Sequence, residues 1–179
     1  ANANAELAQV GQARPGDTVL FYFSGHGVRE RTDIELFQEG EVDDRLGGLV
    51  CWNYDLNDAN TPSDTVLSNK EIRYLIYQLN KDHQKGAKIE VLTIFDCCHS
   101  GSNSRDLADG AKPKQIKRSS IRTRPIGGFI FAKDKAFRSK LKKAEKRPGS
   151  LALDEVLPQG DHIMMAACRE IELAWQASN

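Results

Sequence analysis

The sequence predicts an α/β domain built around a mainly parallel sheet. Two apolar runs of strand length, DTVLFYFS at 17–24 and KIEVLTIF at 88–95, lie on either side of a segment with helical periodicity. Continuous apolar runs of this length are typical of strands that are buried on both faces of a parallel sheet. Strands that alternate with helices in this way predict the α/β class.

The helix between the two strands is predicted by its start signal and its periodicity. Ser68 has the character of an N-cap, and Glu71 follows it at the spacing of a capping box. The apolar residues that recur at helical spacing are Ile72, Leu75, Ile76 and Leu79. Gly86 marks the end of this helical region.

Four further segments complete the expected order of elements. Residues 1–13 are typical of the end of a helix, which Pro15-Gly16 would stop. Residues 28–48 are charged and predict a loop, whereas 49–54 (LVCWNY) predict a short strand. A third strand of the parallel sheet is predicted at 161–167 (DHIMMAA).

The length and the cysteine usage indicate the class of protein. The 179 residues are of single-domain size, and four scattered cysteines are too few for a disulfide framework. No apolar stretch approaches the roughly 18 residues of a membrane span, and no signal sequence is visible at the N-terminus. We therefore expect a cytoplasmic protein without a membrane interaction.

A basic segment is hidden by the formal net charge of zero. Residues 112–147 contain 14 Lys and Arg against two acidic residues, which gives this segment a charge of +12. Such a segment could bind nucleic acid, but it also contains several Pro, Gly and Ser residues. We predict that 111–150 is an exposed basic linker or insertion, and we expect no nucleic-acid partner.

Two motifs follow the two central strands. SGHG occupies 24–27 and DCCHSG occupies 96–101. The carboxyl ends of parallel strands meet at one edge of the sheet, where catalytic groups commonly gather. His26 and a cysteine could therefore face each other there as a base and a nucleophile. The backbone amides of Gly27 and of the cysteine are candidates for an oxyanion hole.

The pair of motifs, YFSGHG with DCCHSG, resembles the caspase-like cysteine peptidases and, within them, the metacaspase, paracaspase and bacterial caspase-like branch. The resemblance implies a caspase-like three-layer sandwich with a mainly parallel sheet flanked by helices. It also implies that His26 is the catalytic histidine and Cys98 the nucleophile, with Cys97 a bystander. The two catalytic positions are 72 residues apart, against roughly 50 in caspases, which fits an insertion after the histidine.

The resemblance also implies how the chain is divided. Residues 1–110 would be the large-subunit-like (p20) part, 111–150 the basic linker, and 151–179 the start of the small-subunit-like (p10) part. HIMMAACRE at 162–170 resembles the first strand of the small subunit. Core strands of the family lie beyond both ends of this sequence, so we expect other domains or chains to complete the fold.

Substrate preference is predicted from the acidic residue two positions before the nucleophile. A carboxylate at the floor of a pocket favours a cationic side chain, because opposite charges offset the cost of desolvation. The resemblance implies that Asp96 and Ser24 line the first specificity pocket (S1), which would accept Arg or Lys. The expected partners are protein or peptide substrates with a basic residue at the cleaved bond.

The basic linker has a second interpretation, since many family members are cut between their two subunits. The candidate self-cleavage sites are Arg118, Arg122, Arg124 and Arg147. A solvated loop whose charges only aid solubility is the alternative.

No cofactor is required for this cysteine chemistry, but calcium is an open possibility. The resemblance places an acidic cluster after the histidine loop, with Asp43 and Asp44 as candidate ligands beside Glu39 and Glu41. A charged surface loop is the alternative interpretation. A zinc site made of Cys97, Cys98 and neighbouring histidines is disfavoured, because adjacent cysteines chelate awkwardly.

Two functions from different classes remain open at this point. The first is a cysteine endopeptidase that cleaves after Arg or Lys and processes itself in the linker. The second is a caspase-like scaffold or regulatory domain that binds partners without turnover. The presence of both a histidine and a cysteine at the motif positions favours the peptidase.

Overall fold

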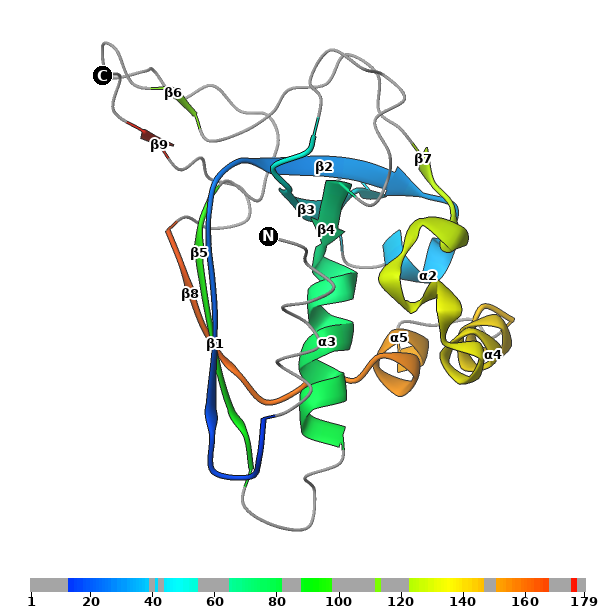
Figure 1. The fold of residues 1–179 in the computed structure, drawn as a ribbon. Coiled ribbons are helices and arrows are strands. Elements are labelled where there is room, and N and C mark those ends of the chain that lie inside the picture. The colour runs from blue at the N-terminus through cyan, green and yellow to red at the C-terminus, as the bar shows by residue number, and fades with distance from the viewer. Residues whose placement is uncertain are drawn as a thin grey trace.

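The computed structural model describes residues 13–38, 41, 44–54, 65–81, 88–97, 112–113, 123–146, 151–167 and 175–176. One sheet runs along one side of helix α3 (Asn69–Lys81), and short helices lie on the other side of that helix (Figure 1). A second sheet crosses the end of α3 (Figure 1).

The first sheet is wholly parallel, as predicted. Its strands are β1 (Thr18–Ser24), β5 (Glu90–Asp96) and β8 (Ile163–Ala166), in the order β1-β5-β8. All three strands were expected from their apolar runs, and together with α3 they confirm the α/β class.

Only one face of this sheet is covered by the described part of the chain. Ile76 of α3 packs against Val91 of β5 and Ile89 just before it. On the opposite face, Leu20 and Tyr22 of β1 are 59% and 60% exposed. The prediction that the first strand is buried on both faces is therefore wrong for the described residues, because α3 packs on one side only.

Helix α3 begins as the capping-box pattern predicted. The backbone N–H of Ser68 donates to Oε2 of Glu71 at 2.8 Å, and the N–H of Glu71 donates to Oγ of Ser68 at 3.3 Å. These reciprocal bonds satisfy donors that the first turn of a helix leaves unpaired.

The second sheet corrects two predictions about 28–54. It has the order β4-β3-β2-β7, with strands β2 (Gly27–Thr32), β3 (Leu46–Val50), β4 (Val66–Ser68) and β7 (Thr123–Arg124). The expected loop at 28–48 thus contains β2, the short helix α2 (Glu35–Gln38) and most of β3, and the expected strand at 49–54 ends at Val50. Strand β2 lacked an apolar pattern because two of its buried residues, Arg29 and Glu30, are charged.

The expected exposed linker is in large part folded. Residues 123–146 form β7, the 3₁₀ helices η3 (Ile126–Gly128) and η4 (Ile130–Lys133), and α4 (Lys135–Ala144), and α5 (Leu151–Val156) follows. Their apolar side chains join a large buried cluster: Ile34, Leu36, Phe37, Leu46, Phe129, Phe131, Phe137, Leu141, Ala144, Leu153, Val156 and Leu157. Four of the lysines that suggested a linker, Lys135, Lys140, Lys142 and Lys143, are exposed residues of α4.

Two short strands, β6 (Lys112–Pro113) and β9 (Trp175–Gln176), pair antiparallel. Among the residues that the structure describes, no helix has the length and apolar character needed to cross a membrane.

Candidate active site

The two motifs are brought together by the register of β1 and β5. Ser24 lies opposite Asp96 in this parallel pair, and Oγ of Ser24 donates to Oδ2 of Asp96 at 3.0 Å. His26 follows Ser24 by two residues, and Cys98 follows Asp96 by two residues. His26 and Cys98 therefore both follow paired residues at the carboxyl edge of the sheet. Cys98 itself lies outside the described residues.

The loop that carries His26 is held by backbone hydrogen bonds from both sheets. The N–H of Gly25 donates to the carbonyl of Asp96 at 3.3 Å, and the N–H of Val50 donates to the carbonyl of His26 at 3.0 Å. The side chain of His26 is exposed and the neighbouring Gly27 is buried. The imidazole is thus presented to solvent from a fixed backbone.

Cys97, the first of the two adjacent cysteines, lies in the core. Cys97 is fully buried and packs with Leu49 and Phe95. Its thiol therefore faces the core and is not accessible to a substrate. A peptide substrate arriving at this edge of the sheet would have to react with another group.

The Ser24–Asp96 pair places a carboxylate at this edge of the sheet, at the point where the two motifs meet. The Ser24 side chain is exposed and Asp96 is half-buried. The hydrogen bond from Ser24 fixes one carboxylate oxygen of Asp96. A carboxylate held in this way can accept further donors from an ammonium or guanidinium group.

Among the four predicted self-cleavage sites, Arg124 is the one that the structure describes, and its surroundings argue against cleavage. Its side chain is 1% exposed and it forms ion pairs with Glu30 and Glu71. The next residue is Pro125, whose ring nitrogen would be the leaving group. Arg118, Arg122 and Arg147 lie outside the described residues.

Two members of the acidic cluster, Glu41 and Asp44, lie among the described residues. Oε1 of Glu41 accepts hydrogen bonds from Lys70 Nζ at 2.6 Å and from Asn69 Nδ2 at 2.7 Å, so a lysine already neutralises its charge. Asp44 is exposed, and Asp43 lies outside the described residues. Within the described part of the chain, no group of three or more His, Cys, Asp or Glu side chains could hold a metal ion.

Comparison with known proteins identifies the family. The profile described as "Metacaspase, peptidase C14 domain" matches residues 2–107, which is more than half of the chain and includes both motifs. The chain belongs to the metacaspase family of C14 peptidases. This family is one of caspase-like cysteine peptidases, so the resemblance inferred from SGHG and DCCHSG is confirmed at the level of the family.

Three curated metacaspases show the extent of the similarity. Metacaspase-1 of Plasmodium falciparum (isolate 3D7) is 30% identical over 105 residues, which are 58% of this chain and 14% of that protein. Metacaspase-2 of Trypanosoma brucei brucei (strain 927/4 GUTat10.1) is 25% identical over 93 residues, covering 52% and 22%. Metacaspase-3 of Trypanosoma cruzi (strain CL Brener) is 33% identical over 92 residues, covering 51% and 21%. The match therefore spans about a fifth or less of these relatives.

The metacaspase motifs were evident in the sequence, but their supporting contacts were not. Val50 donates a hydrogen bond to the carbonyl of His26 and lies in β3, which pairs with β2. The sequence of β2 has no apolar pattern that would predict a strand. Arg124 was singled out only for its charge, and Glu71 only as a helix cap. Neither segment carries a local signal of burial, since Arg124 is flanked by Thr123 and Pro125, and Glu71 by Lys70 and Ile72.

Proposed function

We propose that this metacaspase chain is the catalytic part of a cysteine endopeptidase that cleaves after Arg or Lys, with Cys98 as nucleophile and His26 as general base and acid. The observation that carries the proposal is the register of β1 and β5, which pairs Ser24 with Asp96. His26 lies two residues after Ser24, and Cys98 lies two residues after Asp96.

The chemistry follows from the roles of the two side chains. His26 takes the proton of the Cys98 thiol, and the thiolate attacks the carbonyl carbon of the substrate. The imidazolium then returns the proton to the leaving amine, and water hydrolyses the resulting thioester with His26 again as base. The amides of Gly27 and Cys98 would donate to the developing oxyanion.

Substrate preference is proposed from Asp96 and Ser24 as the S1 pocket. The carboxylate of Asp96 would pair with the guanidinium or ammonium group of the substrate, and Ser24 would keep it oriented. A substrate aspartate would meet a like charge at the same place. We therefore propose peptides with Arg or Lys before the cleaved bond.

The experiment compares fluorogenic peptides ending in Arg, Lys or Asp with the wild-type chain and three variants. We expect Cys98→Ala to lose all turnover. Cys97→Ala is the matched control: it removes the neighbouring thiol and should retain turnover, because the nucleophile is still present. Asp96→Asn should lower kcat/KM for the Arg peptide about 10- to 100-fold, because a charge-assisted hydrogen bond contributes about 1.5–3 kcal/mol. Each assay is run with calcium and with a chelator, which tests the candidate ligands Asp43 and Asp44.

Three outcomes contradict parts of this proposal. Turnover retained by Cys98→Ala would show that Cys98 is not the nucleophile. Equal rates for the Arg and Asp peptides would contradict the pocket. Turnover of no peptide by the folded, complete protein would favour the scaffold or regulatory function.

Self-processing is the second part of the proposal, and it rests on the same site. Arg118, Arg122 and Arg147 are the remaining candidate positions, since Arg124 is buried. We expect wild-type protein to accumulate chain breaks after one or more of these residues, and Cys98→Ala to stay intact. Mass spectrometry of both proteins after the same incubation measures this, and an unbroken wild-type chain with active enzyme would contradict it.

A further inference from the structure

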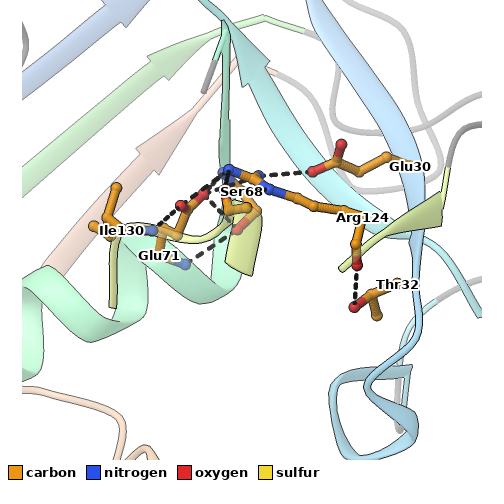
Figure 2. Close-up of polar contacts among 7 residues, drawn as sticks. Glu30, Thr32, Ser68, Glu71, Arg124 and Ile130 are labelled. Atoms are coloured by element: carbon orange, nitrogen blue, oxygen red, sulfur yellow. Dashed lines mark hydrogen bonds and ion pairs between the residues drawn. The ribbon is translucent and has the colours of Figure 1, made fainter. Parts of the chain in front are cut away.

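The guanidinium of Arg124 lies at the centre of a buried ionic cluster (Figure 2). Nη1 of Arg124 lies 2.8 Å from Oε1 of Glu30 and 3.0 Å from Oε2 of Glu71, and Nη2 lies 3.1 Å from Oε1 of Glu71. Nε and Nη2 also donate to the carbonyl of Gly128 at 3.0 and 2.7 Å, and the group lies over the ring of Phe129 at 4.4 Å. All the donor nitrogens of this side chain are therefore occupied within the fold.

The two acidic partners come from two separate elements, strand β2 and helix α3. Glu30 belongs to β2, which begins directly after His26. Glu71 belongs to the first turn of α3, directly after β4, and it also accepts from the N–H of Ser68 at 2.8 Å. Arg124 thus connects the strand that leaves the histidine loop with the helix that leads toward β5.

The strand that contacts the backbone of His26 lies between β2, which carries Glu30, and β4, which precedes Glu71. Strand β3 lies between β4 and β2 in the sheet, and its last residue, Val50, donates to the carbonyl of His26. Arg124 joins β2, on one side of β3, to α3, which directly follows the strand on the other side, β4. Any shift of β2 relative to α3 would therefore move the backbone that carries the imidazole.

The folded segment 123–146 is attached through the same cluster. Oε1 of Glu71 accepts from the N–H of Ile130 at 2.7 Å, and the carbonyl of Arg124 accepts from Oγ1 of Thr32 at 3.1 Å (Figure 2). The segment is thus bound to both β2 and α3 by buried polar contacts. On the side of the segment, these contacts are made by Arg124 and Ile130, which lie within 123–146.

We propose that Arg124 is a positioning residue for catalysis, which makes the segment 123–146 a constituent of the active enzyme. The ionic cluster fixes the histidine hairpin against α3, and so fixes His26 relative to the strand that ends at the nucleophile. A chain break before 123 or after 146 would leave the segment docked. This inference rests on the proposed function for its catalytic consequence, but not for its structural part.

Hydrogen exchange tests the structural part without any turnover. Arg124→Met removes the charge, Glu30→Gln weakens the ion pair between Arg124 and β2, and Lys142→Met removes an exposed lysine of α4 as a matched control. We expect amides of 27–32, 66–75 and 126–134 to exchange at least about 10-fold faster in both cluster variants, while those of β1 stay protected. The control should match wild type.

Two exchange results would overturn the proposal. In Glu30→Gln, faster exchange confined to 126–146 would show that the segment does not hold β2. Unchanged exchange in all three regions would show that the cluster does not couple them. Because Glu30→Gln leaves Arg124 paired with Glu71, this variant keeps the test informative if Arg124→Met does not fold.

Kinetics tests the catalytic part in the full chain. We expect Arg124→Met to lower kcat for the Arg peptide about 10- to 100-fold with little change in KM, because a displacement of about 1 Å can cost this much. Arg124→Lys keeps the charge without the forked donors and should recover part of the loss. The rate at which iodoacetamide alkylates Cys98 should fall in parallel, since it reports activation of the thiol by His26.

The outcomes separate the two proposals. A change confined to KM, or wild-type kcat and alkylation in Arg124→Met, would overturn the positioning role. A wild-type chain without turnover would contradict the proposed peptidase, whereas the exchange experiment would still decide whether Arg124 couples the three regions.

Discussion

Gly25 has almost no space beside it, and this restricts the loop that carries His26. A β-carbon at this position would lie 2.8 Å from Cζ of Phe23, whose ring packs against the cluster around Phe95 and Cys97. The N–H of Gly25 donates to the carbonyl of Asp96. The glycine therefore leaves room for the Phe23 ring beside the loop that carries His26.

Gly25→Ala should lower the free energy of unfolding by about 1–3 kcal/mol, because the added methyl group forces the Phe23 ring or the loop to move. Chemical denaturation measures this change. Gly127→Ala is the matched control, since a β-carbon there has nothing within 4 Å. Equal stability of Gly25→Ala and wild type would mean that the ring moves aside freely.

Helices α3 and α4 are joined by one polar contact within an aromatic cluster. The hydroxyl of Tyr74 donates to Oδ2 of Asp134 at 2.9 Å, and Oδ1 of Asp134 caps α4 by accepting from the N–H of Phe137 at 2.9 Å. Burial, followed by the bond to Asp134, raises the pKa of Tyr74 to about 12. The hydrogen bond to the Phe137 N–H is the main reason that the pKa of Asp134 lies below its usual value.

This contact predicts a loss of stability in alkali. Below the ordinary tyrosine pKa of 10.0, Tyr74 is protonated in both the folded and the unfolded state, and its contribution is fully present. The contribution is lost as the pH rises from there through about 12, because the unfolded chain releases the proton first.

Tyr74→Phe should lower stability at neutral pH by about 1 kcal/mol and remove this part of the alkaline decline. Denaturation curves collected between pH 7 and 12 measure both effects. Tyr22→Phe, at an exposed position, is the control and should follow wild type. A decline of the same size in Tyr74→Phe would assign it to other groups.

At the scale of the molecule, the parallel sheet presents one bare apolar face. The register aligns Leu20, Leu92 and Ile163 in one row and Tyr22, Ile94 and Met165 in the next. The members of these rows on β1 and β8 are more than half exposed. A contiguous apolar surface of this kind is uncommon on an isolated domain.

We expect this face to bind a hydrophobic dye such as ANS in the folded state. Replacing Tyr22 and Met165 together by Ser should lower dye fluorescence at least about twofold and change stability by less than about 0.5 kcal/mol, as for other exposed sites. Trp52→Ser removes an exposed aromatic side chain outside the sheet and should have little effect. Dye binding that is unchanged in the double variant would place the binding surface elsewhere.

Local patterns in the sequence were sufficient for several elements. The strands β1, β5 and β8 follow from their apolar runs, and the start of α3 follows from Ser68 and Glu71, because each signal lies within a few residues of the element that it predicts. The family follows from two short motifs, since the residues of each motif are contiguous.

Other features were decided only by the tertiary structure. Burial of Glu30 in β2 and of Arg124 in β7 depends on ion pairs between residues far apart in the sequence, so the charged segments that contain them resemble a loop and a linker in the sequence alone. The sequence by itself determined the family, through the two motifs, and the parallel sheet that carries them. The tertiary structure decided which charges are buried, because a buried charge is stable only where its partners from other elements meet it.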